Sequence, residues 1–232
     1  MAIRPVFITL YCSPFCIEEK IDFLYYSGFA EVQKKKSIKS LHDAFLKKNP
    51  NRKVLEISSK SENELGVKLS AFNLKIETKY KKNYSVEVVF QSSKVFQNGG
   101  PYRDLLEMTP KEAKKDERLK NSGKLTCFDL FGKKFELNPV TYYYNWLYIN
   151  ALNLNTDLAD ELMNYNAFTD IAFNPEKSIN CQARAAAVYV SLREQGLLKK
   201  ALENKESFLD IVYSNKKDSN SKIEQLSLLD LL

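Results

Sequence analysis

The chain has 232 residues, of which 44% are hydrophobic and 28% are charged, with 35 Lys and Arg against 29 Asp and Glu. This composition is typical of a globular protein and excludes an intrinsically disordered chain. No apolar run approaches the ~18 residues of a membrane span, and the N-terminal segment lacks the apolar core of a signal peptide. We therefore expect a cytoplasmic protein that does not contact a membrane.

Histidine and cysteine are too scarce for several kinds of site. His42 is the only histidine, and the four cysteines form no CxxC pair: Cys12, Cys16, Cys127 and Cys181. A zinc site would have only scattered ligands, and a Ser-His-Asp system would have no partner motif around His42. We predict no metal and no cofactor, so any chemistry must use carboxylates, lysines, tyrosine or asparagine.

The first half of the chain mixes strand and helix patterns. Four segments have the alternation or the β-branched content of strands: 3–12, 21–29, 53–58 and 68–76. Ser37 suits the N-cap of a helix that ends before Asn49-Pro50. The segment 86–96 fits a strand by its β-branched residues and a helix by its apolar spacing.

Clearer cap and turn signals follow this ambiguous segment. Thr109-Pro110 with Glu112 has the pattern of a capping box with proline at the first helical position. It predicts a helix that stops near Gly123. Residues 125–137 predict a hairpin that turns at Gly132.

The second half has mostly helical patterns. Helices are predicted in four places: after Asn138-Pro139, over 156–164, from Asn180 to Gly196, and over 197–213. We therefore predict a mainly α fold with a small β component in the N-terminal half. A polar tether over 214–222 and an apolar tail over 223–232 complete the chain.

Several motifs occur in a characteristic order over about residues 55–195. Leu69-Ser70-Ala71-Phe72 precedes the segment 86–96, and Phe168-Thr169-Asp170 and Asn180 follow. In this order they resemble the NADAR (YbiA-like) domain family, whose motifs are LSNF, SEHxFQAxKF and Trp-Gly-Asp. The chain departs from the family at three positions, where the family has Asn, His and Gly: Ala71, Val88 and Thr169.

The closer resemblance is to NADAR antitoxins paired with DarT-type DNA ADP-ribosyltransferase toxins, through the stretches WLYINAL and SINCQAR. It implies a compact YbiA-like domain that hydrolyses the N-glycosidic bond between ADP-ribose and guanine in DNA. ADP-ribosylated DNA is then the substrate, ADP-ribose the product and a DarT-type toxin the partner. We expect an N-terminal extension packed on the core (1–52), a catalytic domain (53–213), and a tether with its tail (214–232).

The residues of segment 86–96 support this chemistry independently. On a helix, Glu87, Gln91 and Lys94 stand at i, i+4 and i+7 and project from one side. A surface pair on an edge helix is the alternative interpretation. Cleaving ribose C1 from a base nitrogen needs a proton donor and stabilisation of an oxocarbenium-like carbon, and a carboxyl can do both. Glu87 is our first catalytic candidate.

Asp170 is the candidate for a second carboxylate, with a turn or cap aspartate as the alternative. A lysine offers another route, because a neutral amine can take over ribose C1 as a Schiff base. The resemblance places Lys60 where NADAR sequences commonly have lysine, so Lys60 ranks first for this role and Lys94 second. A solvated loop lysine is the alternative for Lys60.

The remaining candidates are expected to bind the substrate: Ser70, Phe72, Asn73, Phe90, Gln91, Trp146, Phe168 and Asn180. Trp146 is the aromatic residue we expect to stack on a flat base, and core packing is its alternative. Asn73 is the candidate source of the amide that Ala71 lacks.

Two other functions fit the same residues. One is an N-glycosidase acting on a small aminated ribose metabolite, and the other is a non-catalytic antitoxin that sequesters its toxin. Residues 225–229 also resemble the peptide by which bacterial proteins dock on the DNA sliding clamp. Packing as a last helical turn, or binding the toxin, are the alternatives for this tail.

Overall fold

The computed structural model describes residues 1–28, 30–176 and 178–213. The predicted tether over 214–222 and the clamp-like peptide at 225–229 lie outside these residues. Of these described residues, 43% are helical and 19% lie in strands, and the strands form three sheets. The predicted mainly α fold is therefore wrong, because the domain is a mixed α/β structure, although the expected β component of the N-terminal half is present.

A four-stranded sheet joins segments that are far apart in the sequence. Its strands are β1 (Ala2–Thr9), β2 (Cys16–Phe23), β3 (Val54–Glu56) and β9 (Ala167–Thr169), in the order β2-β1-β9-β3. Strand β9 pairs antiparallel with β1 and parallel with β3. The sheet therefore brings the N-terminal hairpin next to the residues that precede Asp170.

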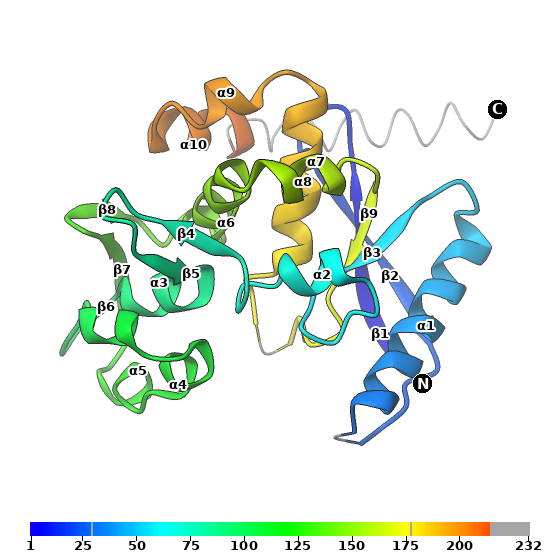
Figure 1. Ribbon diagram of the computed structural model, residues 1–232, viewed down its shortest axis with the longest axis horizontal. Helices are drawn as coiled ribbons and strands as arrows, with labels where there is room; N and C mark the ends of the chain where they lie inside the picture. Colours follow the sequence, from blue (N-terminus) through cyan, green and yellow to red (C-terminus); the bar gives the residue numbers. More distant parts are fainter. Residues whose placement is uncertain (29, 177, 214–232) are drawn as a thin grey trace.

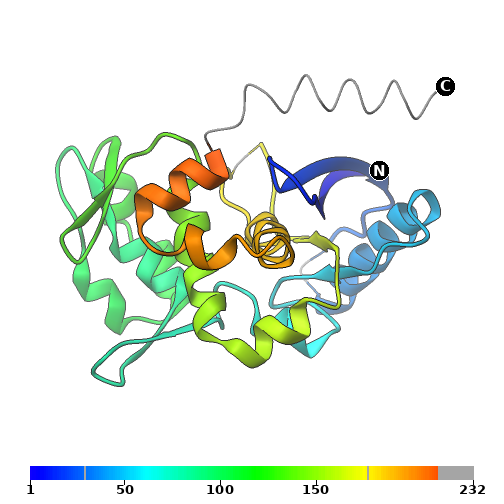
Figure 2. The ribbon, with the colours of Figure 1, turned by 90° about the horizontal axis from the view of Figure 1, so that it is seen from above.

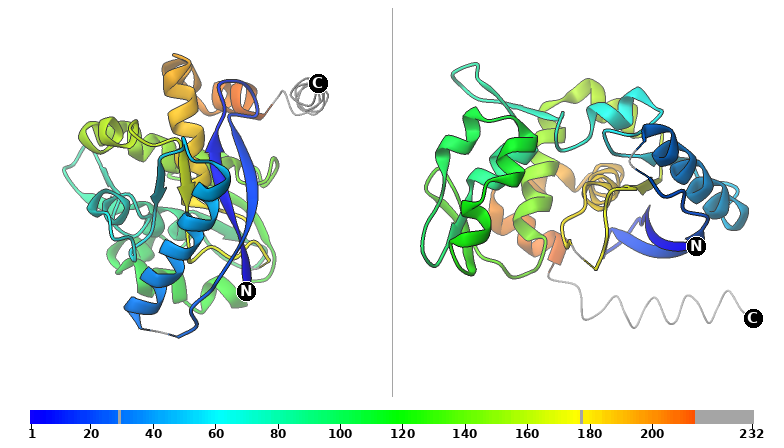
Figure 3. Two further views of the ribbon diagram at one scale, coloured as in Figure 1. Left: turned by 90° about the vertical axis from the view of Figure 1, so that its right-hand side faces the viewer. Right: turned by 90° about the horizontal axis from the view of Figure 1, so that it is seen from below.

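Alternation along β1 separates two layers of core on the two faces of this sheet. Val6 and Ile8 pack in one cluster with Leu41 and Phe45 of helix α1 (Glu31–Lys48). Phe7, between them in sequence, belongs to the larger cluster on the other face, which helix α8 (Gln182–Glu194) covers. The left view of Figure 3 shows α1 lying across the sheet.

Helix α8 also connects the sheet to the rest of the domain, and Figure 2 shows it end-on between the two sides. On the far side lie α6 (Tyr142–Leu154), α3 (Val86–Ser92) and a three-stranded sheet. That sheet contains β6 (Lys94–Phe96), β7 (Leu125–Leu130) and β8 (Lys133–Phe135).

Short elements complete the described chain. The helices are α2 (Glu64–Lys68), η1 (Arg103–Glu107), α4 (Pro110–Lys115), α5 (Arg118–Asn121), α7 (Thr156–Leu162), α9 (Leu198–Ala201) and α10 (Lys205–Tyr213). The remaining strands, β4 (Lys75–Glu77) and β5 (Asn83–Ser85), form a separate two-stranded sheet.

Cap and turn chemistry predicted local structure well. Thr109 and Glu112 form the expected capping box at the start of α4. The predicted hairpin turns between β7 and β8, where Gly132 has a φ of +91°.

The segment 86–96 contains both predicted structures in succession. Ser85 caps α3 by accepting a hydrogen bond from the Val88 amide, and β6 begins at Lys94.

Other boundaries differ from the sequence prediction. The segment 68–76 is not a strand, because α2 and a turn occupy most of it before β4 begins at Lys75. Strand β2 lies at Cys16–Phe23 instead of the expected 21–29, and the two helices α9 and α10 replace the single helix expected over 197–213. Helix α6 begins after Thr141 rather than at Asn138-Pro139.

Candidate functional site

Helix α3 places a carboxylate and an amide together in the interior. Glu87 and Gln91 are each only 5% exposed. They stand one turn apart, and Gln91 Nε2 donates a 2.8 Å hydrogen bond to Glu87 Oε1. Gln91 Oε1 is buried and has no hydrogen-bond partner in the described part of the chain. The pair therefore presents a carboxylate and an unused acceptor.

A lysine from the neighbouring helix α4 completes the environment of Glu87. Lys114 Nζ lies 3.6 Å from Glu87 Oε1 and 5.3 Å from the centre of the Phe72 ring. The Lys114 side chain is mostly exposed, whereas that of Glu87 is buried. The cation and the amide together complement a negatively charged Glu87.

Lys94 lies against Phe90 of α3. Helix α3 ends at Ser92, so Lys94 is the first residue of β6 instead of the third member of a helical stripe. Its Nζ lies 5.0 Å from the centre of the Phe90 ring. Burial, reinforced by Lys114 and opposed by Glu87, lowers the pKa of Lys94 to about 8. About a tenth of the lysine is then neutral at pH 7.

A turn over 69–73 links Glu87 to the second half of the chain. The Glu87 amide donates to the Ala71 carbonyl at 2.9 Å, and the Ala71 amide donates to Gln182 Oε1 at 2.7 Å. Gln182 Nε2 in turn donates to Asp170 Oδ2 at 3.0 Å. In Figure 1 this turn, after α2, meets the start of α8 at the lower end of that helix.

Asp170 combines the two interpretations that its sequence allowed. Its Oδ1 accepts hydrogen bonds from the amides of Ala172 and Phe173, as a turn aspartate does. Burial, followed by the negative charge of Glu56, raises the pKa of Asp170 to about 7. A substantial fraction of this half-buried carboxyl therefore carries a proton at neutral pH.

Lys60 has a different environment from Lys94. It follows β3 in a turn, its side chain is 43% exposed, and its Nζ lies 3.9 Å from Glu31 Oε2. No hydrogen bond or ion pair joins it to Glu87 or Asp170 within the described residues. The proposed role of Lys60 as nucleophile stays a prediction.

The predicted substrate-binding residues divide by position. Ser70, Phe72, Phe90 and Gln91 surround Glu87 through the 69–73 turn and α3, and the buried Ser70 hydroxyl has no partner in the described chain. Asn73 is exposed and its amide donates to the Val67 carbonyl, which closes the turn. Asn180 is half-buried just before α8.

The two other predicted aromatics lie in the core. Phe168 is completely buried in β9. Trp146 is half-buried and packs on Phe135, with ring centres 4.9 Å apart, and its buried Nε1 has no partner among the described residues.

Sequence reasoning missed several residues that build this region: Glu56, Lys114, Tyr144, Tyr148 and Gln182. Tyr144 packs edge-on against Phe90 at 5.1 Å, and burial together with Glu87 raises its pKa well above 10. Tyr148 donates a 2.7 Å hydrogen bond to the Leu69 carbonyl. Their i, i+4 spacing in the aromatic helix was the one signal that could have identified the two tyrosines.

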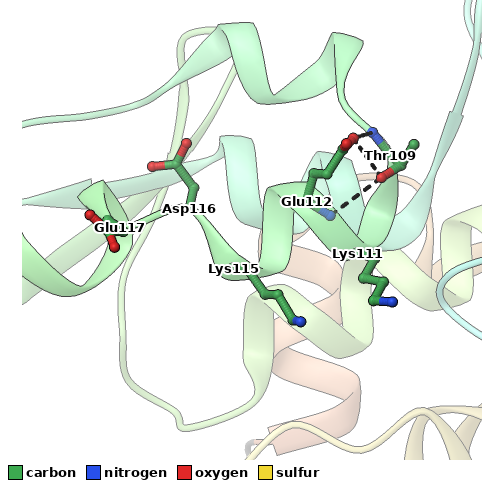
Figure 4. A pocket seen from close by; sticks show the side chains of 6 residues that line it. All are labelled: Thr109, Lys111, Glu112, Lys115, Asp116 and Glu117. Carbon is green, nitrogen blue, oxygen red and sulfur yellow. Dashed lines mark hydrogen bonds between the residues drawn. The ribbon is translucent and has the colours of Figure 1, made fainter.

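The outer surface of α4 has a depression that contains none of the predicted site residues. Its lining residues are drawn in Figure 4: Thr109, Lys111, Glu112, Lys115, Asp116 and Glu117. Lys111 and Lys115 extend side by side from the same helix that supplies Lys114. Its two lysines are outnumbered by three carboxylates, so the depression itself adds no net positive charge.

The described residues contain neither a metal-binding cluster nor a membrane-spanning helix. No group of three or more His, Cys, Asp or Glu side chains in 1–28, 30–176 and 178–213 is arranged to hold a metal ion. Over the same residues, no helix has both the length and the apolar character needed to cross a membrane.

Fold and site thus define a mixed α/β domain in which hydrogen bonds join the backbone of Glu87 to Asp170, and a lysine of lowered pKa lies against Phe90 of the same helix. The chain belongs to the family of DarT1-associated NADAR antitoxins, whose sequence model matches residues 2–222. This match confirms the predicted family. No curated protein matches the chain.

Proposed function

We propose that this antitoxin is an ADP-ribosyl hydrolase that removes ADP-ribose from guanine bases in DNA. The observation that carries the proposal is the hydrogen-bonded path from Glu87 through Ala71 and Gln182 to Asp170. It connects the backbone of Glu87 to the Asp170 carboxylate, and two carboxyls in different environments suit the proton donation and charge stabilisation of N-glycosidic hydrolysis. The family supports the antitoxin role, and its name associates it with a DarT1 toxin.

The environments of the two carboxylates suggest a division of labour. Asp170, with its pKa raised to about 7, is suited to donate a proton to the guanine nitrogen as the bond from ribose C1 breaks. The electron pair of that bond goes to the nitrogen. Glu87, beside Lys114 and Gln91, is suited to remain charged and stabilise the oxocarbenium-like carbon.

Lys94 supplies a second way to complete the reaction. Its neutral amine can add to C1 of the ring-opened sugar and expel the guanine nitrogen, which takes up a proton, to leave a Schiff base. Water then hydrolyses the Schiff base, which releases ADP-ribose and regenerates the lysine amine. In the direct route, water adds to the same carbon and no adduct forms. The burial of Lys94, which lowers its pKa to about 8, favours it over the exposed Lys60 for the covalent route.

The surface charge favours a nucleic-acid substrate over a small metabolite. Lys111, Lys114 and Lys115 are exposed on one short helix beside Glu87. Lysines of this kind attract the phosphates of DNA without reading its sequence.

The test is to incubate the protein with oligonucleotides that carry ADP-ribose on guanine or on thymine, and with a small aminated ribose phosphate. We expect release of free ADP-ribose and recovery of the unmodified guanine oligonucleotide. No release from any substrate would contradict catalysis and leave sequestration of the toxin. Release from the small molecule alone would identify the metabolite as the substrate.

A further inference from the structure

Glu56 accepts hydrogen bonds from the residues on both sides of Asp170 in sequence. This glutamate ends β3 and is only 2% exposed. Its Oε2 accepts a hydrogen bond from Thr169 Oγ1 at 2.6 Å, and its Oε1 accepts one from the Ile171 amide at 2.9 Å. The two donors are the neighbours of Asp170 in sequence. One carboxylate therefore fixes the backbone from which Asp170 projects.

A histidine extends this contact to α1. His42 Nε2 lies 2.8 Å from Thr169 Oγ1. Because the single hydroxyl proton of Thr169 is donated to Glu56, the hydroxyl oxygen accepts a hydrogen bond from His42 Nε2–H. Burial lowers the pKa of His42 to about 4 against the opposing effect of Asp43, so the ring is neutral near pH 7. The chain of donors from His42 through Thr169 ends on Glu56.

Glu56 and Asp170 lie in a region where the described residues supply no compensating cation. In the described ranges, neither Glu56 nor Asp170 forms an ion pair with lysine or arginine. The other groups that face them are neutral or weakly acidic: Ser58 after β3, Tyr144 and Tyr148 of α6, and Cys181 and Gln182 at the start of α8. Burial raises the pKa of both carboxyls in these surroundings, so the pair favours a shared proton near neutral pH.

The hydrogen bonds that the two carboxyls accept favour the ionised form at Glu56 over the ionised form at Asp170. Glu56 accepts bonds of 2.6 and 2.9 Å, whereas the three bonds accepted by Asp170 measure 3.0, 3.0 and 3.2 Å. Shorter bonds from neutral donors stabilise the ionised form more strongly. Asp170 is also the less buried of the two and the one connected to Gln182.

We propose that Glu56, supported by Thr169 and His42, is a positioning residue that orients Asp170 and keeps the shared proton on it. The inference rests on the proposed role of Asp170 as proton donor. The raised pKa of Asp170, to which the charge of Glu56 contributes, agrees with this arrangement. The inference thus gives Thr169 a function at a position where the wider family has glycine.

The first test is the ratio of Glu56→Gln turnover to wild-type turnover between pH 5 and pH 8. Without the charge at residue 56, Asp170 ionises at lower pH, so the ratio should fall by about tenfold for each unit of lowered pKa. The ratio cancels the titration of Lys94, which both proteins share. A merely structural role would give a ratio that does not change with pH.

Two further variants serve this test. Thr169→Val keeps the branched shape of the side chain but removes the hydroxyl. The ratio of its turnover to wild-type turnover should also fall as the pH rises. This variant tests the inference if Glu56→Gln does not fold. Glu194→Gln, an exposed change at the end of α8, should give a flat ratio. A flat ratio in the folded variants of Glu56 and Thr169 would overturn the inference.

A second measurement separates this inference from the proposed function. Carbon-13 NMR of labelled aspartate follows the Asp170 carboxyl directly, with its signal identified by its loss in Asp170→Asn. We expect a titration midpoint near neutral pH in the wild type and at least about one unit lower in Glu56→Gln. An unchanged midpoint would overturn the inference even if the enzyme were active. A lowered midpoint in a protein that hydrolyses nothing would support it and reject the proposed function.

Discussion

The charge of Glu87 can be removed by a substitution that keeps the shape of its side chain. Replacing it by glutamine keeps the volume of the side chain and its contact with Gln91, but removes the negative charge beside Lys114. We expect hydrolysis to fall by at least about a hundredfold, while the free energy of unfolding changes by about 1 kcal/mol or less. Single-turnover release of ADP-ribose and urea unfolding measure the two quantities.

Glu194→Gln is the matched control for this prediction, because Glu194 is exposed and makes no hydrogen bond or ion pair within the described chain. Its turnover should equal that of the wild type. Near-normal turnover in Glu87→Gln would remove Glu87 from the reaction.

A covalent intermediate could be attached to either of two lysines, Lys94 or Lys60. The lowered pKa of Lys94 makes its amine available at neutral pH, so borohydride added during turnover should leave one ADP-ribose on the peptide that contains Lys94. The yield should rise with pH through about 8 as the amine loses its proton. Mass spectrometry of the digested protein gives the site.

Lys94→Met should abolish the adduct, whereas Lys60→Met should retain it, because Lys60 is exposed and paired with Glu31. An adduct on Lys60 would reverse this order. The absence of any adduct during active turnover would support direct attack by water.

The raised pKa of Asp170 also predicts how the stability of the protein depends on pH. Because its pKa in the folded protein is raised above the usual value of 3.8 to about 7, the folded state favours the protonated form. Its contribution to stability is full below about pH 4 and is lost as the pH rises through 7. Asp170→Asn removes this dependence, so the variant should gain stability relative to the wild type between pH 4 and pH 8.

The gain has an upper limit of about 4 kcal/mol, at about 1.4 kcal/mol for each pKa unit, and sharing of the proton with Glu56 reduces it. Urea unfolding at a series of pH values measures it. Asp210→Asn, at an exposed position in α10, is the control and should follow the wild type. A constant difference between Asp170→Asn and the wild type would show that Asp170 titrates normally.

The residues of the site were predictable only where they share a local segment. Glu87, Gln91 and Lys94 were identified from spacing, although Lys94 reaches the site from a strand. Glu56 and Gln182 act on Asp170 through contacts between segments more than 100 positions apart or between a loop and a helix start. Such contacts have no periodicity, so single-sequence reasoning could not identify them.

At the scale of elements, the close packing of α2 predicts a strong effect of one methyl group. A Cβ at Gly66 would lie 2.0 Å from the carbonyl oxygen of Glu56 and 2.5 Å from Ser61 Oγ. Gly66→Ala must therefore displace α2 or the end of β3, at a cost of about 1–3 kcal/mol or more. Because Glu56 holds the Asp170 segment, hydrolysis should fall as well.

Gly132→Ala provides the comparison for this element-scale prediction. No atom lies within 4 Å of a Cβ there, so only the positive φ of +91° opposes the change, at about 1 kcal/mol. Thermal unfolding of both variants tests the difference. Equal stability of the two would show that α2 can shift without cost.

The error in fold class also belongs to this scale. Six of the described strands have only three residues: β3, β4, β5, β6, β8 and β9. A strand this short cannot show a period of two, and β9 forms only because β1 and β3 lie on either side of it. The cap at Thr109 and the turn at Gly132 were predicted correctly, because their chemistry lies within a few residues. The cap predicted at Ser37 was wrong, since Ser37 lies inside α1, which begins at Glu31.

At the scale of the whole molecule, the sheet and the helical side meet at the site. Asp170 follows β9 of the sheet, Glu87 lies on α3 of the other side, and Gln182 opens the helix α8 that runs between them. The site is thus complete only when both sides are folded and packed. Loss of either carboxylate should then abolish antitoxin action if that action is catalytic, without loss of the folded domain.

The decisive whole-molecule experiment is co-expression with a DarT1-type toxin. If hydrolysis neutralises the toxin, the wild-type protein and Glu194→Gln should restore growth, whereas Glu87→Gln and Asp170→Asn should not, although all four accumulate as folded proteins. DNA recovered from the cells should retain ADP-ribose only with the two inactive variants, because the toxin continues to modify guanine while removal is blocked. Growth restored by Glu87→Gln, together with unmodified DNA and co-purification of the toxin, would show that the antitoxin acts by sequestration. The carboxylates would then be part of the fold alone.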